Sequence, residues 1–402
     1  HDKTEGIILK ISKDNEFIEE AKTGDEVEII TNQTPFYGES GGQVGDQGTI
    51  STNKSKITIK DTLKKMGDLH VHLGKIDSGS IKVGDIVNLK INIEKRNNAR
   101  AYHSATHLLH EALRRTLGKH VTQKGSLVSP EKLRFDFSHN KPIESNEINK
   151  IEKFVNDMVE ASSEVKTRIM TPNEAVENGA LALFGEKYGD EVRVLSMGKE
   201  GDSFFSTELC GGTHVKNIKD IGRFKIISQS SIASGIRRIE ALRDIQLESY
   251  EKYIKESKSN KEKNLIEEIN SIKKELELLS IIPSYNEDIK LGENLKNLTK
   301  QIEQIKIKNI INDKTKNLIK DKKINNFTLR YQVLTDLPSK ELRNIVDQGK
   351  KEIKSGIIIA CSIYEGKIGV AVGITDKLIK NYDAVKLVKE AAEILGGKGG
   401  GG

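Results

Sequence analysis

Two pairs of metal-binding residue types stand out in this sequence. His103 and His107 are four positions apart, and so are Cys210 and His214. On a helix, residues i and i+4 lie on one face one turn apart, so both imidazoles of the first pair can reach one ion. Three imidazole nitrogens and one thiolate form a donor set that suits zinc. We therefore predict one zinc ion shared by all four residues.

Each pair taken alone also has an ordinary explanation. The chain holds 9 histidines, so a His-x3-His spacing can arise by coincidence or from hydrogen-bonded histidines. Cys210 followed by His214 could be a buried thiol beside a surface histidine. The presence of both pairs in one chain favours a shared site. His110 lies three residues after His107, on the same face of the predicted helix. It could support one of the metal ligands, or it could have no role.

The local sequence is compatible with this arrangement of the two pairs. Residues 98–117 are predicted to form a helix that ends at Gly118, a residue typical of helix C-termini. The apolar residues of this helix follow a different stripe, so the histidines are not forced into a core. Two glycines between Cys210 and His214 permit the sharp turn that directs both side chains at one ion.

The chain is predicted to be α+β in four segments. Short alternating runs with Gly-Asp turns indicate a small β-barrel in residues 1–92. Residues 93–240 mix helices and strands and would carry the zinc site. Residues 241–325 show apolar steps of three and four, which indicate two helices in an antiparallel hairpin or coiled coil. Residues 326–402 form an α/β unit. The spacing of the hairpin allows each helix to pack on the other or on a second copy of the chain.

Composition limits the class of protein. The 402 residues fit two or three domains rather than one, and the mean hydropathy of −0.49 indicates much polar helix. A net charge of +6 permits a nucleic-acid partner without requiring one. The two cysteines lie in separate regions, Cys361 within an apolar strand, which argues against a disulfide framework and fits the cytoplasm.

The ends of the chain and its apolar runs carry two further expectations. No apolar run is long enough to cross a membrane. The start lacks Met and the end is a glycine run, so we expect a piece of a longer chain, truncated at both ends.

Several motifs resemble the editing domain of alanyl-tRNA synthetases. They are His103-Ser-Ala-Thr-His107-Leu-Leu-His110, Gln123-Lys-Gly-Ser-Leu-Val128, Leu133-Arg-Phe-Asp-Phe-Ser-His139, Glu208-Leu-Cys-Gly-Gly-Thr-His-Val215, Gly235-Ile-Arg-Arg-Ile-Glu-Ala241 and Thr34-Pro-Phe-Tyr-Gly-Glu-Ser-Gly-Gly-Gln43. The resemblance continues through the helical segment to the glycine-rich end and covers nearly the whole chain. No segment resembles the adenylate-forming, ATP-binding core of that family, so aminoacylation is not assigned to these residues.

The resemblance implies hydrolysis of the ester of serine or glycine on tRNA(Ala), an aminoacyl-tRNA deacylase activity with zinc as cofactor. It implies that Thr34 lines the amino-acid pocket, that Gln43 and Gln123 lie near the substrate, and that Cys210 is the ligand able to yield. Arg237 or Arg238 could meet RNA phosphates. The C-terminal unit would touch the tRNA body, and together with the coiled coil it could form a homodimer.

Four other readings compete with this one. The editing domain of threonyl-tRNA synthetases shares the His-x3-His and Cys-x3-His layout, although the Cys-Gly-Gly-Thr-His form and the trailing coiled coil favour the alanine family. Free-standing alanyl-tRNA editing proteins are closer rivals. Zinc could also be a structural staple in a non-catalytic tRNA-binding module, because four protein ligands leave no open position. A phosphoesterase would need an Asp-His-His motif, which is absent.

Overall fold

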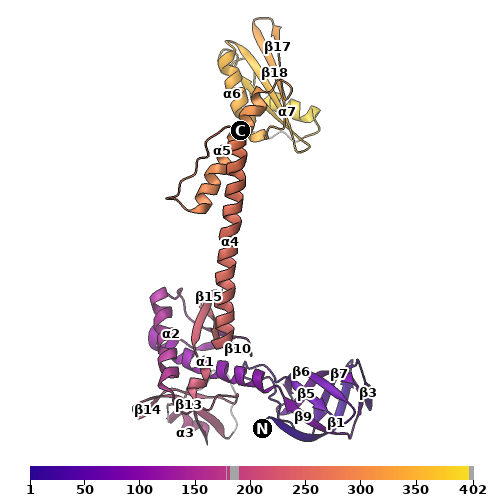
Figure 1. Ribbon diagram of the computed structural model, residues 1–402, viewed down its shortest axis with the longest axis vertical. Helices are drawn as coiled ribbons and strands as arrows, with labels where there is room; N and C mark the ends of the chain where they lie inside the picture. The colour runs from indigo at the N-terminus through magenta and orange to yellow at the C-terminus, as the bar shows by residue number, and fades with distance from the viewer. Residues whose placement is uncertain (178, 182–189, 398–402) are drawn as a thin grey trace. The chain divides into compact units, whose positions relative to one another are not determined.

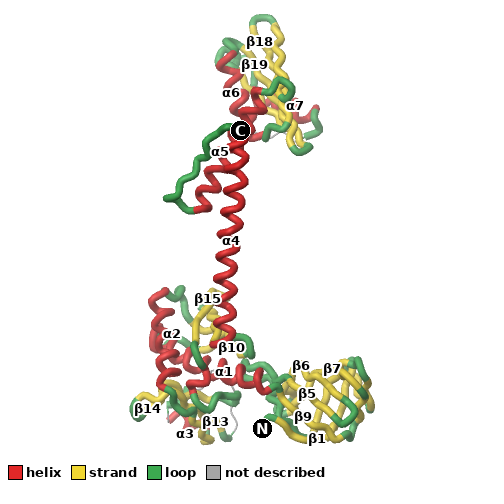
Figure 2. Tube along the Cα trace, in the orientation of Figure 1, coloured by secondary structure: helices red, strands yellow, loops and turns green. Residues whose placement is uncertain are grey.

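A computed structural model describes residues 1–177, 179–181 and 190–397 (Figure 1). Helices and strands both contribute, as the α+β prediction requires (Figure 2). The chain divides into two compact units, His1–Ile254 and Lys255–Gly402, and the boundary lies inside helix α4 (Asp244–Leu278). Each unit is described below by itself.

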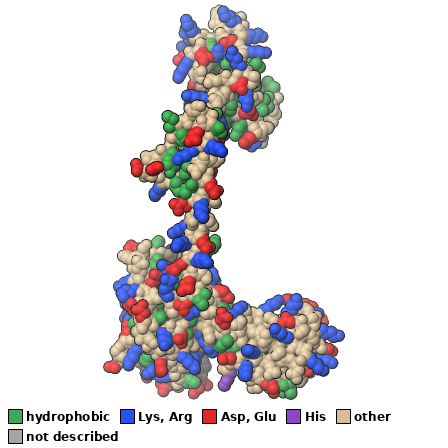
Figure 3. Space-filling model, viewed as in Figure 1, with side chains coloured by type: hydrophobic (Ala, Val, Ile, Leu, Met, Phe, Trp, Pro, Cys, Tyr) green, Lys and Arg blue, Asp and Glu red, His purple; other side chains and the backbone are tan. Residues whose placement is uncertain are grey.

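Basic and acidic side chains are interspersed over the visible surface (Figure 3). This mixture agrees with a composition in which 65 Lys and Arg face 59 Asp and Glu. Among the described residues, no helix combines the length and the apolar character needed to cross a membrane.

The first unit begins with a closed six-stranded barrel, which confirms the predicted small β-barrel. Its strands follow the order β1 (Lys3–Lys13), β4 (Glu26–Thr31), β7 (Leu69–Ser78), β6 (Lys56–Lys65), β5 (Gly48–Ser51) and β9 (Ile86–Ile91). Antiparallel pairing of β1 with β9 closes the circle. Every second residue points inward, so isoleucines such as Ile29, Ile50 and Ile76 fill the interior. The short strand β2 (Glu16–Ile18) pairs with β1, and β3 (Glu20–Lys22) and β8 (Ser80–Lys82) pair with each other in a separate two-stranded sheet.

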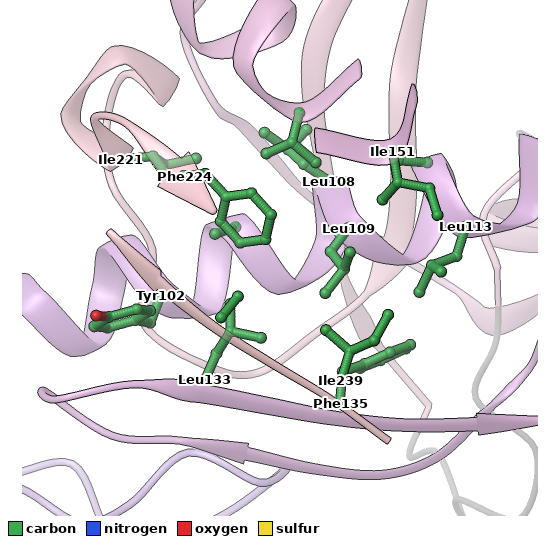
Figure 4. Packing of buried hydrophobic residues seen from close by; sticks show 14 of the residues in the cluster. Tyr102, Leu108, Leu109, Leu113, Leu133, Phe135, Ile151, Ile221, Phe224 and Ile239 are labelled. Carbon is green, nitrogen blue, oxygen red and sulfur yellow. The ribbon is translucent and has the colours of Figure 1, made fainter. Parts of the chain in front are cut away.

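Helix α1 (Ile93–Leu117) leaves the barrel and enters a second core. It begins five residues before the predicted start because the side chain of Asn92 caps it by accepting a hydrogen bond from the Lys95 amide. It packs on helix α2 (Ser145–Ala161) and on an antiparallel sheet. That sheet has the order β10 (Gln123–Val128), β11 (Leu133–Ser138), β16 (Ile236–Arg243) and β15 (Phe224–Ala233). Apolar residues of helix and sheet interlock there, among them Leu109, Phe135 and Ile239 (Figure 4).

A three-stranded sheet lies beside this core, and the loop after its last strand carries Cys210 and His214. Its order is β12 (Lys166–Met170), β13 (Val192–Glu200) and β14 (Ser203–Leu209). Helix α3 (Pro172–Glu177) packs on β13, and the short helix η1 (Ile218–Ile221) packs on α1 and α2. The chain leaves β14 at Leu209 and turns towards α1 at once.

The second unit contains the predicted helical hairpin. The C-terminal part of α4 packs on helix α5 (Leu291–Asn312) through an apolar seam that includes Ile269, Leu276, Leu298 and Ile302. Residues 279–290 form the connection between the two helices.

A four-stranded sheet follows, in the order β17 (Asn317–Ile324), β18 (Phe327–Thr335), β19 (Gly356–Tyr364) and β20 (Lys367–Ile374). Helix α6 (Leu342–Glu352), preceded by the short helix η2 (Ser339–Glu341), packs on β19 and β20, and helix α7 (Ala384–Ile394) packs on β20.

The helical segment is shorter than the predicted 241–325. It ends at Asn312, and residues 317–324 form strand β17, which pairs with β18. The cause is local: Asn325 adopts a positive φ of 49°, which asparagine tolerates, and this closes a tight hairpin at Asn325–Asn326.

Candidate metal centre

The four predicted ligands come together in the first unit. The ligand atoms of His103, His107, Cys210 and His214 all lie within 4.8 Å of one another. His103 and His107 project from adjacent turns of α1 with their rings nearly parallel, at 11° and a centroid distance of 5.2 Å. Cys210 and His214 lie in the loop after β14. The helix pair and the loop pair therefore converge, as their spacing predicted.

Close backbone approach makes this convergence possible at one glycine. A Cβ on Gly212 would lie 2.1 Å from Cε1 of His103, so only glycine allows the loop to come this near the helix. A Cβ on Gly211 would meet nothing within 4 Å. The close approach to the candidate ligand His103 therefore depends on Gly212 and not on Gly211.

Each of the three histidines is held by a hydrogen bond at its Nδ1 atom. The partner of His103 is Oε1 of Gln43 at 2.8 Å, that of His107 is Oε2 of Glu208 at 2.6 Å, and that of His214 is Oγ of Ser104 at 3.3 Å. Such partners fix which ring nitrogen faces an ion, because the nitrogen that carries the proton cannot be a ligand.

The opposite ring nitrogens face the thiol. The Sγ atom of Cys210 lies 3.4 Å from Nε2 of His103 and 3.3 Å from Nε2 of His214. Nε2 of His107 is buried and has no hydrogen-bond partner among the described residues. A buried nitrogen without a partner is costly unless something else binds it. Together with the nitrogen and sulfur donor set, this observation fits a zinc ion.

The electrostatics of the group favour a thiolate. Burial raises the pKa of the Cys210 thiol, but the charges of His103 and His107 and the hydrogen bond to His103 hold it well below its usual value. For His107, burial lowers the pKa, whereas Glu208 and Cys210 outweigh burial and raise the pKa to about 10. Burial and the neighbouring His103 lower the pKa of His214 to about 3.

Gln43 lies behind the ligands rather than on open surface. It is fully buried, and its side-chain oxygen also accepts a hydrogen bond from the Thr213 amide at 3.0 Å. Its amide nitrogen donates to the Thr213 hydroxyl at 2.8 Å. Gln43 therefore joins the barrel loop to both halves of the centre. The neighbouring Gly42 has a φ of 83° and packs closely against Ser126. A Cβ added to Gly42 would lie only 2.7 Å from the Ser126 carbonyl oxygen.

The other predicted substrate residues are Thr34, in the loop between β4 and β5, and Gln123, in strand β10. The hydroxyl of Thr34 contacts Nε2 of His72 at 2.8 Å and accepts a hydrogen bond from the Phe36 amide at 3.1 Å. Gln123 begins strand β10, partly exposed, opposite Phe137 of β11.

The two arginines proposed to meet RNA are bonded within the protein. Arg238 makes a two-pronged contact with the buried Asp136, from Nε to Oδ1 at 2.7 Å and from Nη2 to Oδ2 at 2.8 Å. Arg237 donates from Nη2 to Gln229 at 3.1 Å. On β16 they are neighbours, so their side chains leave opposite faces of the sheet, as expected.

Glu208 and Ser104, which contact the candidate ligands His107 and His214, were not predicted as site residues from the sequence. Glu208 contacts both His107 and His110, which explains the third histidine of the motif. A usable signal existed for Glu208. A carboxylate two residues before a ligand thiol lies on the same side of an extended chain and can face the helix that carries the histidines.

Comparisons with known proteins match successive parts of the chain. Residues 1–95 match the family model of tRNA synthetases class II (A), residues 192–240 that of the threonyl and alanyl tRNA synthetase second additional domain, and residues 326–402 that of the DHHA1 domain. Proteins named alanine–tRNA ligase from Parvibaculum lavamentivorans and Sphingopyxis alaskensis are each 44% identical over 99% of this chain. The chain belongs to the alanyl-tRNA synthetase family.

The extent of these matches adds three facts. The chain spans 44% of the length of both relatives, and of a third from Rhodopseudomonas palustris that is 43% identical. Residues 192–240 include Cys210 and His214, so half of the candidate centre lies within the second additional domain shared by alanyl- and threonyl-tRNA synthetases. The match of residues 1–95 relates the barrel to class II tRNA synthetases, in agreement with the resemblance of its Thr34–Gln43 motif.

Proposed function

We propose that this chain is the editing part of an alanine–tRNA ligase and hydrolyses the ester that joins serine or glycine to tRNA(Ala). The observation that carries the proposal is the convergence of three histidines and one cysteine in a chain of this family. A pocket built for alanine excludes the smaller glycine poorly and rejects the added hydroxyl of serine only weakly. A second site that hydrolyses the wrong products solves this problem.

His103, His107, Cys210 and His214 would hold one zinc ion. When bound, zinc would supply polarisation of the ester carbonyl, activation of water or orientation of the terminal ribose. The chain's own residues prepare the site. Gln43 and Ser104 hold the rings of His103 and His214 in place, and Cys210, in the loop, is the ligand able to yield to water or substrate.

Thr34 would contact the amino-acid moiety, accepting a hydrogen bond from the serine hydroxyl. The hydroxyl of Thr34 already faces His72, so its oxygen has one remaining lone pair for a substrate donor. The Gly41–Gly42 backbone and Gln123 would line the approach of the terminal adenosine.

The rest of the chain would bind and place the tRNA. In this proposal residues 1–92 act as the barrel and residues 93–240 as the editing core, both in the cytoplasm. Helices α4 and α5 act as the helical hairpin, and the sheet unit that begins with β17 acts as the tRNA-binding unit. Arg237 keeps donors beyond its bond to Gln229 and could reach a phosphate. The hairpin and C-terminal unit could also pair with a second copy of the chain.

Deacylation tests this proposal directly. Seryl- and glycyl-tRNA(Ala) are incubated with the wild-type chain and with the variants Cys210→Ala and His107→Ala. We expect at least a hundredfold loss of rate in both variants. Cys361→Ala, which changes the other cysteine, should leave the rate unchanged. Wild-type rates in the two ligand variants would refute the proposal.

One observation favours a second candidate, a zinc-stapled tRNA-binding module. Four protein donors within 4.8 Å of one another could fill a tetrahedral zinc site and leave no open position. In that case the chain would bind tRNA(Ala) and zinc, but seryl-tRNA would stay intact even with the protein in excess over the tRNA. Deacylation by the wild-type chain excludes this candidate.

A further inference from the structure

The carboxylate of Glu208 contacts two imidazoles at once. Oε2 lies 2.6 Å from Nδ1 of His107, and Oε1 lies 2.9 Å from Nδ1 of His110. Glu208 is 2% exposed, and both histidines are buried. The two rings stand three residues apart on α1, so one carboxylate at the end of β14 can reach both.

We propose that Glu208 is a positioning residue for the metal centre, which presents Nε2 of His107 to the ion by holding the ring proton on Nδ1. The inference rests on the proposed zinc centre. A carboxylate only accepts hydrogen bonds, so each facing Nδ1 carries the proton. The remaining nitrogen of His107, Nε2, is then a free ligand. This nitrogen is buried and, like Nε2 of His110, has no hydrogen-bond partner among the described residues, but it alone belongs to the group of four candidate ligands.

His110 has a different part in this arrangement. Its ring packs on Phe135 at a centroid distance of 5.3 Å, and it does not belong to the group of four candidate ligands. Its contact occupies the second oxygen of Glu208, so the carboxylate is fixed from two sides and cannot rotate away from His107. His110 therefore acts on Glu208, and only through Glu208 on His107.

Gln43 shows why a carboxylate is required at position 208. The amide of Gln43 serves one ring, because its oxygen accepts from His103 and its nitrogen donates to Thr213. Glu208 faces two ring nitrogens and needs two acceptors. An amide there would turn an N–H towards one ring, and that ring would have to move its proton to Nε2. Where that ring is His107, the ligand is lost. Where it is His110, His107 keeps only a neutral amide oxygen, which is a weaker acceptor than a carboxylate and holds the proton on Nδ1 less firmly.

The variant Glu208→Gln tests this inference, because it keeps the size of the side chain and removes one acceptor. Zinc affinity is measured on the full chain by competition with a chromophoric chelator. We expect binding 10- to 100-fold weaker than that of the wild type, the range found for residues that orient a metal-bound histidine. His110→Phe keeps the bond between Glu208 and His107 and should weaken binding less.

A matched control is Glu152→Gln in the same unit. Glu152 accepts a hydrogen bond from the Ile226 amide at 2.8 Å, which an amide oxygen can replace. It should bind zinc as the wild type does. Equal zinc affinity of Glu208→Gln and wild type overturns the inference and leaves the proposed centre intact. Absence of zinc binding by the wild type overturns both.

The ring protons can also be observed without a variant. Nitrogen-15 spectra of labelled imidazoles distinguish a proton on Nδ1 from one on Nε2. In the wild-type chain, His107 and His110 should both carry the proton on Nδ1, and in Glu208→Gln one of them should shift it to Nε2. A wild-type His107 with its proton on Nε2 alone overturns the inference, even where the variant does not fold.

Discussion

The Thr34 hydroxyl lies 2.8 Å from Nε2 of His72, a residue 38 positions further along the chain and fully buried in the barrel. The other ring nitrogen of His72, Nδ1, lies 2.9 Å from the Ile29 carbonyl oxygen. Because a carbonyl only accepts, Nδ1 carries the proton and Nε2 accepts from Thr34. The barrel interior thus determines the direction in which a residue of the proposed pocket offers its hydroxyl.

This relationship gives a prediction on substrate choice. In Thr34→Val, the substrate serine loses its acceptor, whereas glycine has no hydroxyl to lose. We expect deacylation of seryl-tRNA(Ala) to fall about tenfold, the effect of one hydrogen bond, with glycyl-tRNA(Ala) nearly unaffected. Thr58→Val removes a threonine bonded to Asp77 on the barrel surface and should change neither rate. Equal losses for the two substrates would contradict the assigned role of Thr34.

His72 also makes the stability of the barrel depend on pH. Burial lowers its pKa to about 4, only partly opposed by the hydrogen bond to Ile29. Its unfolded-state pKa is near 6.5. Below pH 6.5, His72 becomes protonated in the unfolded chain, whereas in the folded chain it stays neutral until the pH falls to about 4. Stability is therefore full above about pH 7 and is lost as the pH falls.

The pH dependence of unfolding measures this effect. Between pH 7 and pH 5, His72 should remove about 2 kcal/mol from the free energy of unfolding. To measure this loss, urea unfolding is monitored by circular dichroism for the wild type and for His72→Asn, each at pH 7 and at pH 5. The variant should be less stable at pH 7, and the difference should shrink by that amount at pH 5. A difference that stays constant would show that His72 is not buried in its neutral form.

A pair of glycines tests how the loop approaches the helix. Gly212→Ala would place a methyl group 2.1 Å from Cε1 of His103, so the ring or the loop must move. We expect zinc binding to weaken at least tenfold. Gly211→Ala is the control, because the added carbon meets nothing within 4 Å. Isothermal titration with zinc compares the two variants, and similar affinities would mean that the approach at Gly212 does not matter.

Periodicity and motif spacing predicted the helices, the barrel and the four converging side chains. They did not predict the residues that hydrogen-bond to the candidate ligands, because these hydrogen bonds link positions far apart in the chain. Gln43 and His103 are 60 positions apart, and Glu208 and His107 are 101 apart. Strand β17 was missed because its lysine-rich sequence resembles a polar helix, and pairing with β18 overrides that propensity.

A buried ion pair anchors the loop that carries Thr34 and Gln43. Arg96 of α1 and Asp46 are both 6% exposed, and Nε and Nη2 of Arg96 each donate to one carboxylate oxygen of Asp46. Arg96 also donates to the Pro35 carbonyl oxygen at 2.9 Å. Arg96→Leu leaves Asp46 buried without its partner and should destabilise the chain by about 3–5 kcal/mol.

The surface pair Lys60–Glu26 is the comparison for that ion pair. Lys60→Ala should cost below about 1 kcal/mol in the same urea titration. Equal losses in the two variants would mean that burial does not strengthen the Arg96–Asp46 contact.

Removal of the metal should expose a reactive thiol at Cys210. Burial raises its pKa, but the charges of His103 and His107 outweigh burial and hold the pKa well below its usual value, which favours the thiolate. Burial raises the pKa of Cys361, which makes that thiol slow to react. After chelator treatment, iodoacetamide should therefore label Cys210 at least tenfold faster than Cys361, and added zinc should restore protection of Cys210 alone. Peptide mass spectrometry reads both sites in one sample, so Cys361 serves as the internal control. Labelling of Cys210 at the same rate with and without zinc would show that its sulfur does not bind the ion.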